Sequence, residues 1–360
     1  MASWERNILI TGGAGFIASH VVTLFVKKYP NYKVVVFDML DYCASINNLD
    51  AVKDYPNFKF IQGDIRESQF VRYIFQEENI DTVLHFAAQT HVDLSYWSSL
   101  EFTRTNVFGT HVLINAAFDA GVSKFVHVST DEVYGGNSTV ALNEESKMNP
   151  TNPYAASKAA AECIVNSYWE SFKFPVIITR GNNVYGPHQF PEKCIPKFIS
   201  LLHRDRKCFI HGMGEAMRNF IYVSDVANAF DVIMHNGKPG ETYNVGTDTE
   251  ISIMELATTL IKKMKGAVTE KDVKEWMEFV QDRPFNDPRY PIDSTKLQSL
   301  GWKPEVSWSE GLDKTIEWYK CDKHFNYWAK ASDALKDYPT GSNTVRLFKN
   351  RNPTLGPSKK

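Results

Sequence analysis

Hydrophobic and polar positions in the first half of the chain alternate between short β-branched runs and longer stretches with helical spacing of apolar residues. Such alternation predicts parallel strands joined by crossover helices, the doubly wound (Rossmann) arrangement of an α/β protein. Six runs have the character of strands: Asn7 to Thr11, Lys33 to Asp38, Phe58 to Gln62, Thr82 to Phe86, Lys124 to Ser129 and Pro175 to Arg180.

After about Tyr185 the alternation gives way to segments interrupted by glycine and proline. Helices are predicted near Cys194 to His203, Ser224 to His235 and Ile253 to Lys265. We therefore expect a Rossmann domain over residues 1–185 and a smaller C-terminal substrate-binding domain over 186–330. Some strands and helices of residues 186–330 can pack back onto the Rossmann domain. Residues 331–360 are polar and hold several prolines and glycines, which predicts a loosely ordered tail.

Composition narrows the class of protein. With 43% hydrophobic residues, a chain of 360 residues can bury a sizeable core, while 40 basic against 42 acidic side chains disfavour nucleic acid or an anionic membrane as a partner. No apolar run approaches the ~18 residues of a spanning helix, and the first six residues are too short and polar for a signal peptide. Five scattered cysteines without a CxxC pair argue against a disulfide framework and a zinc site. We expect a cytoplasmic protein.

A glycine-rich segment, Gly12-Gly13-Ala14-Gly15-Phe16-Ile17-Ala18, joins the first strand to an apolar helix. Small residues at such a turn leave backbone amides and the positive helix end free for a pyrophosphate, so Gly12, Gly15, Phe16 and Ile17 are candidate cofactor-binding residues. A tight turn without a ligand has the same sequence.

Two acidic residues at later strand ends strengthen the cofactor interpretation. Asp38 ends the second strand, where its carboxylate can accept hydrogen bonds from the adenosine ribose hydroxyls and repel a 2′-phosphate, which favours NAD over NADP. Asp64 and Ile65 follow the third strand. Asp64 is placed either to meet the adenine edge or to cap the helix expected around Ser68 to Phe75.

Tyr154 and Lys158 are the first catalytic candidates. A proline at the start and a run of alanines favour a helix, and a spacing of four puts both side chains on one face. A nearby ammonium stabilises a phenolate, so we expect Lys158 to lower the pKa of Tyr154 and make it a general base. The same spacing occurs at Tyr29/Lys33, Tyr55/Lys59 and Tyr319/Lys323, but only Tyr154 follows a strand that ends in a hydroxyl.

Several motifs together resemble the dTDP-glucose 4,6-dehydratase branch of the extended short-chain dehydrogenase/reductase family, from residue 6 to about 330. The resemblance rests on the glycine segment from Thr11, His85-Phe86-Ala87-Ala88, the run Ser129-Thr130-Asp131-Glu132-Val133-Tyr134-Gly135, Tyr154 with Lys158, and Tyr185-Gly186-Pro187 leading to Phe190-Pro191-Glu192-Lys193. The adjacent carboxylates of Asp131 and Glu132 are the most specific feature, although two acids at a strand end are also common as solvated loop charges.

The resemblance implies NAD as cofactor, with Ala87 at its site, and a nucleotide-sugar substrate. Tyr154, aided by Thr130 and Lys158, takes the C4 hydroxyl proton while the C4 hydride passes to NAD. Glu132 then removes the C5 proton, Asp131 protonates the departing C6 hydroxyl, and the hydride returns to C6. Because the two carboxylates need different protonation states, we expect their coupled pKa values to be separated.

The same resemblance assigns residues to the substrate. It places His91, Glu192 and Lys193 in the active site, although the last two equally fit an exposed pair at a helix start, and it places four residues on the sugar-nucleotide pyrophosphate: Asn183, Arg218, Asn244 and Arg283. His211 and Asn286 depart from the family pattern and leave the base open between thymine and uracil. A homodimer through the helices Phe102 to Ala120 and Tyr154 to Phe172 is also implied.

Two other functions remain open. A nucleotide-sugar 4-epimerase needs NAD, Tyr154 and Lys158 but not the two carboxylates. A catalytically silent NAD(H)-binding regulatory protein could keep the fold without turnover. The intact set of candidate catalytic residues argues against this function: Thr130, Asp131, Glu132, Tyr154 and Lys158.

Overall fold

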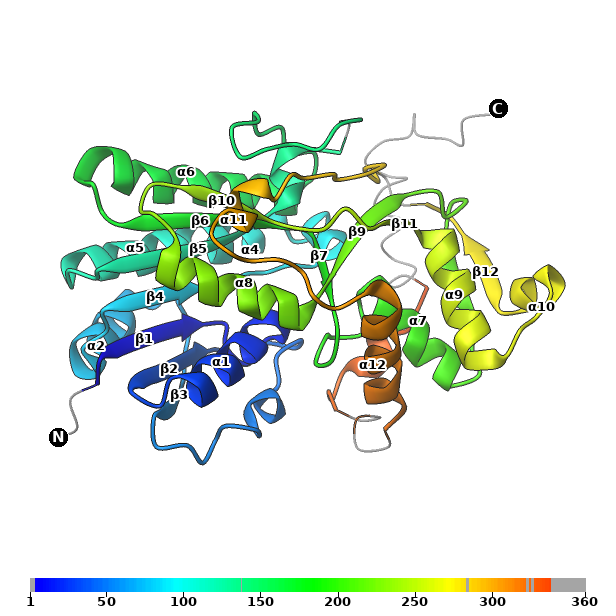
Figure 1. The fold of residues 1–360 in the computed structure, drawn as a ribbon, viewed down its shortest axis with the longest axis horizontal. Coiled ribbons are helices and arrows are strands. Elements are labelled where there is room, and N and C mark those ends of the chain that lie inside the picture. The colour runs from blue at the N-terminus through cyan, green and yellow to red at the C-terminus, as the bar shows by residue number, and fades with distance from the viewer. Residues whose placement is uncertain (1–3, 137, 283–284, 322–323, 325–326, 338–360) are drawn as a thin grey trace.

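The computed structural model describes residues 4–136, 138–282, 285–321, 324 and 327–337. Among these residues, seven strands form one parallel sheet in the order β10-β6-β5-β4-β1-β2-β3 (Figure 1). Their bounds are β1 (Arg6–Thr11), β2 (Tyr32–Asp38), β3 (Phe58–Gln62), β4 (Thr82–His85), β5 (Lys124–Thr130), β6 (Val176–Gly181) and β10 (Thr242–Val245). The doubly wound prediction is confirmed, and each of the six predicted strands begins and ends within one residue of its expected limits.

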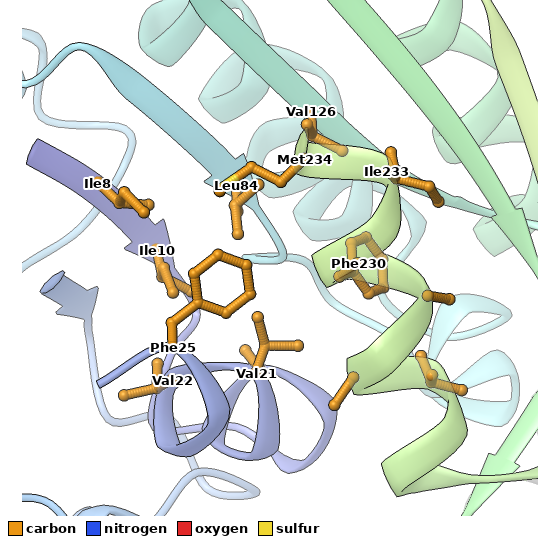
Figure 2. Close-up of a cluster of buried hydrophobic side chains, with 14 of the residues drawn as sticks. Ile8, Ile10, Val21, Val22, Phe25, Leu84, Val126, Phe230, Ile233 and Met234 are labelled. Atoms are coloured by element: carbon orange, nitrogen blue, oxygen red, sulfur yellow. The ribbon is translucent and has the colours of Figure 1, made fainter. Parts of the chain in front are cut away.

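Two helices cover one face of the sheet. Helix α1 (Phe16–Lys28) packs beside α8 (Val223–Asn236), and Figure 2 shows Phe25 of α1 and Phe230 of α8 in one cluster with Ile10 and Leu84 of the sheet. The short η1 (Ile46–Leu49) and α11 (Thr295–Gln298) contribute Leu49 and Leu297 to the same cluster. Both α8 and β10 come from the second half of the chain, so that half completes the first sheet.

The opposite face is covered by helices from the first half. Helix α2 (Ser68–Glu78) packs on α5 (Thr110–Asp119), which packs on α6 (Pro153–Phe172). Their apolar residues meet Leu9, Val35 and Phe125 from the sheet. Shorter elements lead into this layer: α3 (Val92–Ser95), α4 (Ser99–Phe102) and the π-helix η2 (Thr103–Gly109).

A second hydrophobic cluster lies beyond the carboxyl ends of the large sheet. It is built from a sheet of β7 (Asn183–Tyr185), β9 (Met217–Tyr222) and β11 (Glu250–Ser252), a pair of β8 (Cys208–His211) and β12 (Met277–Val280), and the helices α7 (Cys194–His203), α9 (Ile253–Lys265), α10 (Glu270–Glu275), α12 (Trp308–Lys320) and α13 (Ala331–Ala334). Helices α7 and α9 agree with their predicted bounds.

The end of the described chain belongs to this cluster. Ala331 and Ala334 of α13 and the following Leu335 are buried, although the sequence predicts a loosely ordered tail from residue 331. Residues 338–360 of that predicted tail lie outside the described residues. In the part of the chain that the structure describes, no helix has the length and apolar character needed to cross a membrane.

Candidate active site

A cavity of about 470 Å³ lies where the strands of the large sheet end and the second cluster begins. Parallel strands present their carboxyl ends at one edge, which brings together residues that follow β1, β2, β4, β5 and β6. Most predicted site residues line the cavity: Gly12, Gly15, Phe16, Ile17, Asp38, Asp64, Ile65, Ala87, His91, Thr130, Asp131, Glu132, Tyr154, Lys158, Asn183, Glu192, Lys193 and Arg218.

The glycine turn has the shape that a dinucleotide requires. Gly12 has φ +69°, and a Cβ there would lie 2.8 Å from the backbone of Ala87, so only glycine fits between the two strand ends. Gly15 precedes helix α1. No side chain caps the N-terminus of this helix, so the backbone amides of its first turn are open to an anion. These residues fit the pyrophosphate of NAD.

Asp38 and Asp64 line the same end of the cavity. The two carboxylate oxygens of Asp38 accept from the backbone N–H groups of Ala14 at 3.0 Å and Leu40 at 2.7 Å, which fixes the carboxylate where a ribose can reach it. Asp64 forms an ion pair with Arg66, with 2.6 Å between Nη2 and Oδ2. Helix α2 starts after Glu67 without a side-chain cap, so the alternative that Asp64 caps this helix is wrong.

Tyr154 and Lys158 lie on the first turns of α6. Asn152 is the N-cap, its Oδ1 accepting from the N–H of Ala155 at 2.8 Å, and Pro153 occupies the first turn. Both side chains are buried, and the Lys158 ammonium donates to the carbonyl of Val128 on β5 at 2.5 Å. Burial lowers the pKa of Lys158 to about 8, against the effect of Glu162 one turn further along the helix.

The predicted lowering of the Tyr154 pKa is wrong for this structure. Burial raises that pKa, the carboxylates of Glu132 and Asp131 raise it further, and the Thr130 hydroxyl acts in the opposite direction. Lys158, whose ammonium donates to the carbonyl of Val128, is not among the groups that shift the pKa of Tyr154. Ionisation of Tyr154 therefore needs further positive charge in the cavity.

The acid pair, Asp131 and Glu132, lies on a single 3-10 turn, η3 (Asp131–Tyr134), directly after β5. Burial and the neighbouring Glu132 raise the pKa of Asp131 to about 7, and burial also raises the pKa of Glu132. The Oδ2 atom of Asp131 accepts from Asn182 at 2.7 Å, and Oε2 of Glu132 accepts from Asn152 at 2.9 Å. Asp131 can thus hold a proton near neutral pH beside a second carboxylate, as a donor and acceptor pair requires.

Glu192 and Lys193 close another side of the cavity. Glu192 is buried, so the alternative of an exposed pair at the start of α7 is wrong for this residue. Its carboxylate accepts from the hydroxyl of Tyr42 at 2.8 Å and lies 3.9 Å from Nε2 of His91. Burial raises the pKa of Glu192 to about 7. The Lys193 ammonium donates to the carbonyl of Thr90 at 2.8 Å.

Arg218 lies on β9 and lines the cavity. Its guanidinium donates to the carbonyl of Asp287 at 3.0 Å and to Oδ1 of Asn286 at 2.9 Å, and its central carbon is 5.1 Å from the ring centre of Tyr290. All four residues line the cavity. The segment from Asn286 to Tyr290 therefore fixes the position of the Arg218 guanidinium, a role that no sequence pattern indicates for Asp287 and Tyr290.

Asn244 does not reach the cavity, which corrects the prediction that it binds substrate. It is fully buried, its Oδ1 accepts from the hydroxyl of Tyr134 at 2.9 Å, and its Nδ2 donates to the carbonyls of Leu142 and Asp293, each at 3.0 Å. Both ends of the amide are thus engaged by the protein interior. Arg283 lies outside the described residues.

Sequence reasoning also missed Asn152 and Asn182, the side chains that donate to the acid pair. Asn152 precedes a proline and so carries the signal of a helix cap, but its second contact with Glu132 depends on tertiary structure. Asn182 adjoins the predicted Asn183 and has no distinguishing pattern of its own.

Comparisons with known proteins identify the family of the chain. The family model for GDP-mannose 4,6 dehydratase matches residues 9–315. The chain is 57% identical to mouse dTDP-D-glucose 4,6-dehydratase, covering 94% of both chains. It is 49% identical to an Arabidopsis thaliana trifunctional enzyme with UDP-glucose 4,6-dehydratase activity, covering 93% of this chain and 50% of that one.

A solved structure shows the same fold with the cofactor in place. The dTDP-glucose 4,6-dehydratase DesIV of Streptomyces venezuelae, with NAD bound, has a TM-score of 0.85 and 36% identity, covering 91% of this chain and 100% of that one. Fold, cavity and sequence lead to the same assignment. The chain therefore belongs to the GDP-mannose 4,6-dehydratase family and is an NAD-dependent dehydratase.

Proposed function

We propose that this protein is a nucleoside-diphosphate-glucose 4,6-dehydratase, which converts dTDP-glucose or UDP-glucose to the 4-keto-6-deoxy sugar nucleotide and water. The observation that carries the proposal is the meeting of two sets of groups in one cavity. Tyr154 and Lys158 can oxidise C4, and the acid pair of Asp131 and Glu132 can eliminate water across C5 and C6.

Oxidation at C4 is assigned to Tyr154 and its neighbours. Tyr154 accepts the C4 hydroxyl proton, Thr130 hydrogen-bonds the same hydroxyl, and Lys158 assists from the same face of the helix. NAD would be held at the glycine turn and by Asp38, where its nicotinamide ring would supply a local positive charge and the means to take up a hydride from C4 and give it back at C6. The cofactor is regenerated in each cycle, so we expect the protein to purify with some NAD attached.

Elimination is assigned to the acid pair. The C4 ketone makes the C5 hydrogen acidic, and Glu132 removes it as a proton. The C5–H electron pair forms the C5–C6 double bond, the C6–O bond breaks, and Asp131 supplies the proton that makes the leaving group water. Glu132 then returns its proton to C5 when C6 is reduced.

Binding of the sugar nucleotide is assigned to residues of the cavity wall other than those of the glycine turn. Arg218 and Asn183 are assigned to the diphosphate, and His91, Glu192 and Lys193, which also line the cavity, are assigned to the sugar. Arg283 is proposed for the diphosphate on sequence alone. Whether the base of the nucleotide is thymine or uracil stays open. The mouse relative is named for dTDP-glucose and the Arabidopsis relative for UDP-glucose.

The direct test is incubation of the purified protein with dTDP-glucose and UDP-glucose in separate reactions, followed by mass spectrometry. Loss of one water from either substrate is the expected result. A 4-epimerised product of unchanged mass would assign the alternative epimerase activity. Binding of NAD without turnover of either sugar nucleotide would favour a catalytically silent regulatory protein.

A homodimer is proposed through the helices of residues 102–120 and 154–172. Exposed aromatic and aliphatic side chains gather on and beside these helices: Leu100, Phe108, Phe118 and Phe172. Such residues are costly to leave in water, and a two-fold contact would bury them. A monomeric mass in light scattering at working concentration would exclude it.

We also propose a cytoplasmic location, supported by five free cysteines and testable by cell fractionation.

A further inference from the structure

Asn182 lies between β6 and β7 and is buried in the cavity wall, beside the acid of the proposed elimination. Its Nδ2 atom donates to Oδ2 of Asp131 at 2.7 Å. The contact joins residues that are 51 positions apart, and neither the family resemblance nor the sequence pattern assigns a role to it.

The orientation of the Asn182 amide is fixed by two backbone groups. Its Oδ1 accepts from the N–H of Thr247 at 3.2 Å, and its Nδ2 also donates to the carbonyl of Tyr290 at 3.2 Å. A backbone N–H can only donate and a carbonyl can only accept, so a flipped amide would lose both bonds. Gly246 leaves room for this arrangement, because a Cβ there would lie 2.2 Å from Oδ1 of Asn182.

A fixed amide donor constrains the protonation of the acid that it faces. Oδ2 of Asp131 accepts from Asn182, and a carbonyl oxygen is a better acceptor than the hydroxyl oxygen of a protonated carboxyl group, so this contact favours a proton on the other oxygen. That oxygen, Oδ1, lies 3.2 Å from the Thr130 hydroxyl, which can act as donor or acceptor. The proton therefore has one favoured position.

We propose that Asn182 is a positioning residue that keeps Oδ2 of Asp131 an acceptor and so assigns the transferable proton to Oδ1. The inference rests on the proposed dehydratase function. During elimination the Oδ1 proton passes to the C6 oxygen as the C6–O bond breaks and Glu132 takes the C5 proton. The carboxylate left behind accepts from Asn182 at Oδ2 and from Thr130 at Oδ1, which stabilises it.

The same contact balances the strength of the acid. Burial and Glu132 raise the pKa of Asp131, whereas the Asn182 amide and the Thr130 hydroxyl lower it, and the result is a value of about 7. Without Asn182 the pKa of Asp131 rises, so the acid keeps its proton to higher pH but gives it up less readily.

The test uses the full chain with Asn182→Ala and Asn182→Asp, the second of which keeps an acceptor for Thr247. With Asn182→Ala we expect kcat for dehydration to fall about ten- to hundredfold and the alkaline limb of its pH profile to move up by about one pH unit. With Asn182→Asp, whose carboxylate adds a like charge beside Asp131, the alkaline limb should move up by at least as much. Bound NADH should accumulate during turnover because C4 oxidation precedes the impaired step. Affinity for UDP and dTDP, measured by calorimetry, should change less than about threefold.

Asn219→Ala is the matched control. Asn219 is equally buried and its Nδ2 donates to the carbonyl of the same Thr247 at 2.9 Å, but it does not line the cavity. The pH profile of kcat for the Asn219→Ala variant should match that of the parent. If both Asn182 variants keep the parental alkaline limb and accumulate no NADH, the assignment of the proton to Oδ1 is overturned. If the parent itself dehydrates neither sugar nucleotide, the proposed function fails instead.

Discussion

Tyr154 and Lys158 lie on a helix of 20 residues that its own sequence specifies, whereas Asp131 and Glu132 lie on a four-residue 3-10 turn that side chains from other segments hold in place. Helix α6 has its own cap, a proline in its first turn and a run of alanines. The acid pair depends on Asn182 and Asn152, which are far along the chain. In the proposed mechanism, a local element thus carries the oxidation, and a tertiary assembly carries the elimination.

The difference suggests that the two half-reactions can be separated by mutation. Changes on α6 should stop the whole cycle, because elimination cannot begin without C4 oxidation. Changes around η3 should leave oxidation intact and stop or slow the elimination. Variants in each region can therefore test whether oxidation and elimination depend on separate sets of residues.

Tyr154→Phe should have the largest effect, a loss of about 10²- to 10⁴-fold in turnover with no formation of NADH, because the base for the first step is gone. The measurement is product formation together with absorbance in the NADH band. Tyr243→Phe is the control, since it removes an equally buried hydroxyl that lies outside the cavity lining and accepts from the N–H of Lys238. A Tyr154 variant within about tenfold of the parent would remove Tyr154 as the base.

Glu132→Gln should reduce dehydration by about 10²-fold or more but leave oxidation intact, since the amide keeps the size of the side chain and cannot take the C5 proton. Bound NADH should rise on mixing with the sugar nucleotide, without product and without deuterium from solvent entering C5. Glu144→Gln is the control, because this carboxylate lies outside the cavity lining. Dehydration at near-parental rate would end the assignment, and binding without NADH would mean that Glu132 acts before oxidation.

The same division explains what the sequence could predict. The six strands, the glycine turn and the cap of α6 each follow from a few neighbouring residues, and all lie near their expected positions. The prediction for Asn244 is wrong because its side chain, at the end of β10, turns to Tyr134 in the interior rather than to the cavity. The predicted pKa shift of Tyr154 has the wrong sign because that sign depends on burial and on carboxylates that only the fold brings near.

The contacts of Asn182, Asp287 and Tyr290 illustrate the remaining limit. Each of these residues lies in an irregular segment and has partners more than 50 positions away, so no periodicity or local motif identifies them. Their roles follow from distances that arise only when the second half of the chain packs on the first sheet.

The pH dependence of the two half-reactions should also differ. Asp131, with its pKa raised to about 7, must hold a proton to act, so dehydration should fall about tenfold for each pH unit above that value. Formation of bound NADH does not use this proton and should not fall over the same range. Stopped-flow absorbance and quenched product analysis between about pH 6 and 9 provide the two profiles. Parallel loss of both would tie Asp131 to oxidation as well.

Asn152→Asp should have the smallest effect and test the one side chain that joins the two regions. Asn152 caps α6 through Oδ1 and donates through Nδ2 to Glu132 at 2.9 Å. Aspartate caps as well as asparagine, but it cannot donate and it places a second carboxylate beside Glu132, where like charges raise each other's pKa. Loss of the donor raises the pKa of Glu132, which must be ionised to act as base.

The acid limb of dehydration by Asn152→Asp should therefore move up by about one pH unit, with a rate within a few-fold of the parent at higher pH. Asn152→Ala removes the cap too and should lower the free energy of unfolding by about 1 kcal/mol, which separates the cap from the charge effect. Denaturant unfolding and the pH profile of kcat are the measurements. An unchanged acid limb in both variants would leave Asn152 as a helix cap alone, and the two regions would then be joined only through the substrate.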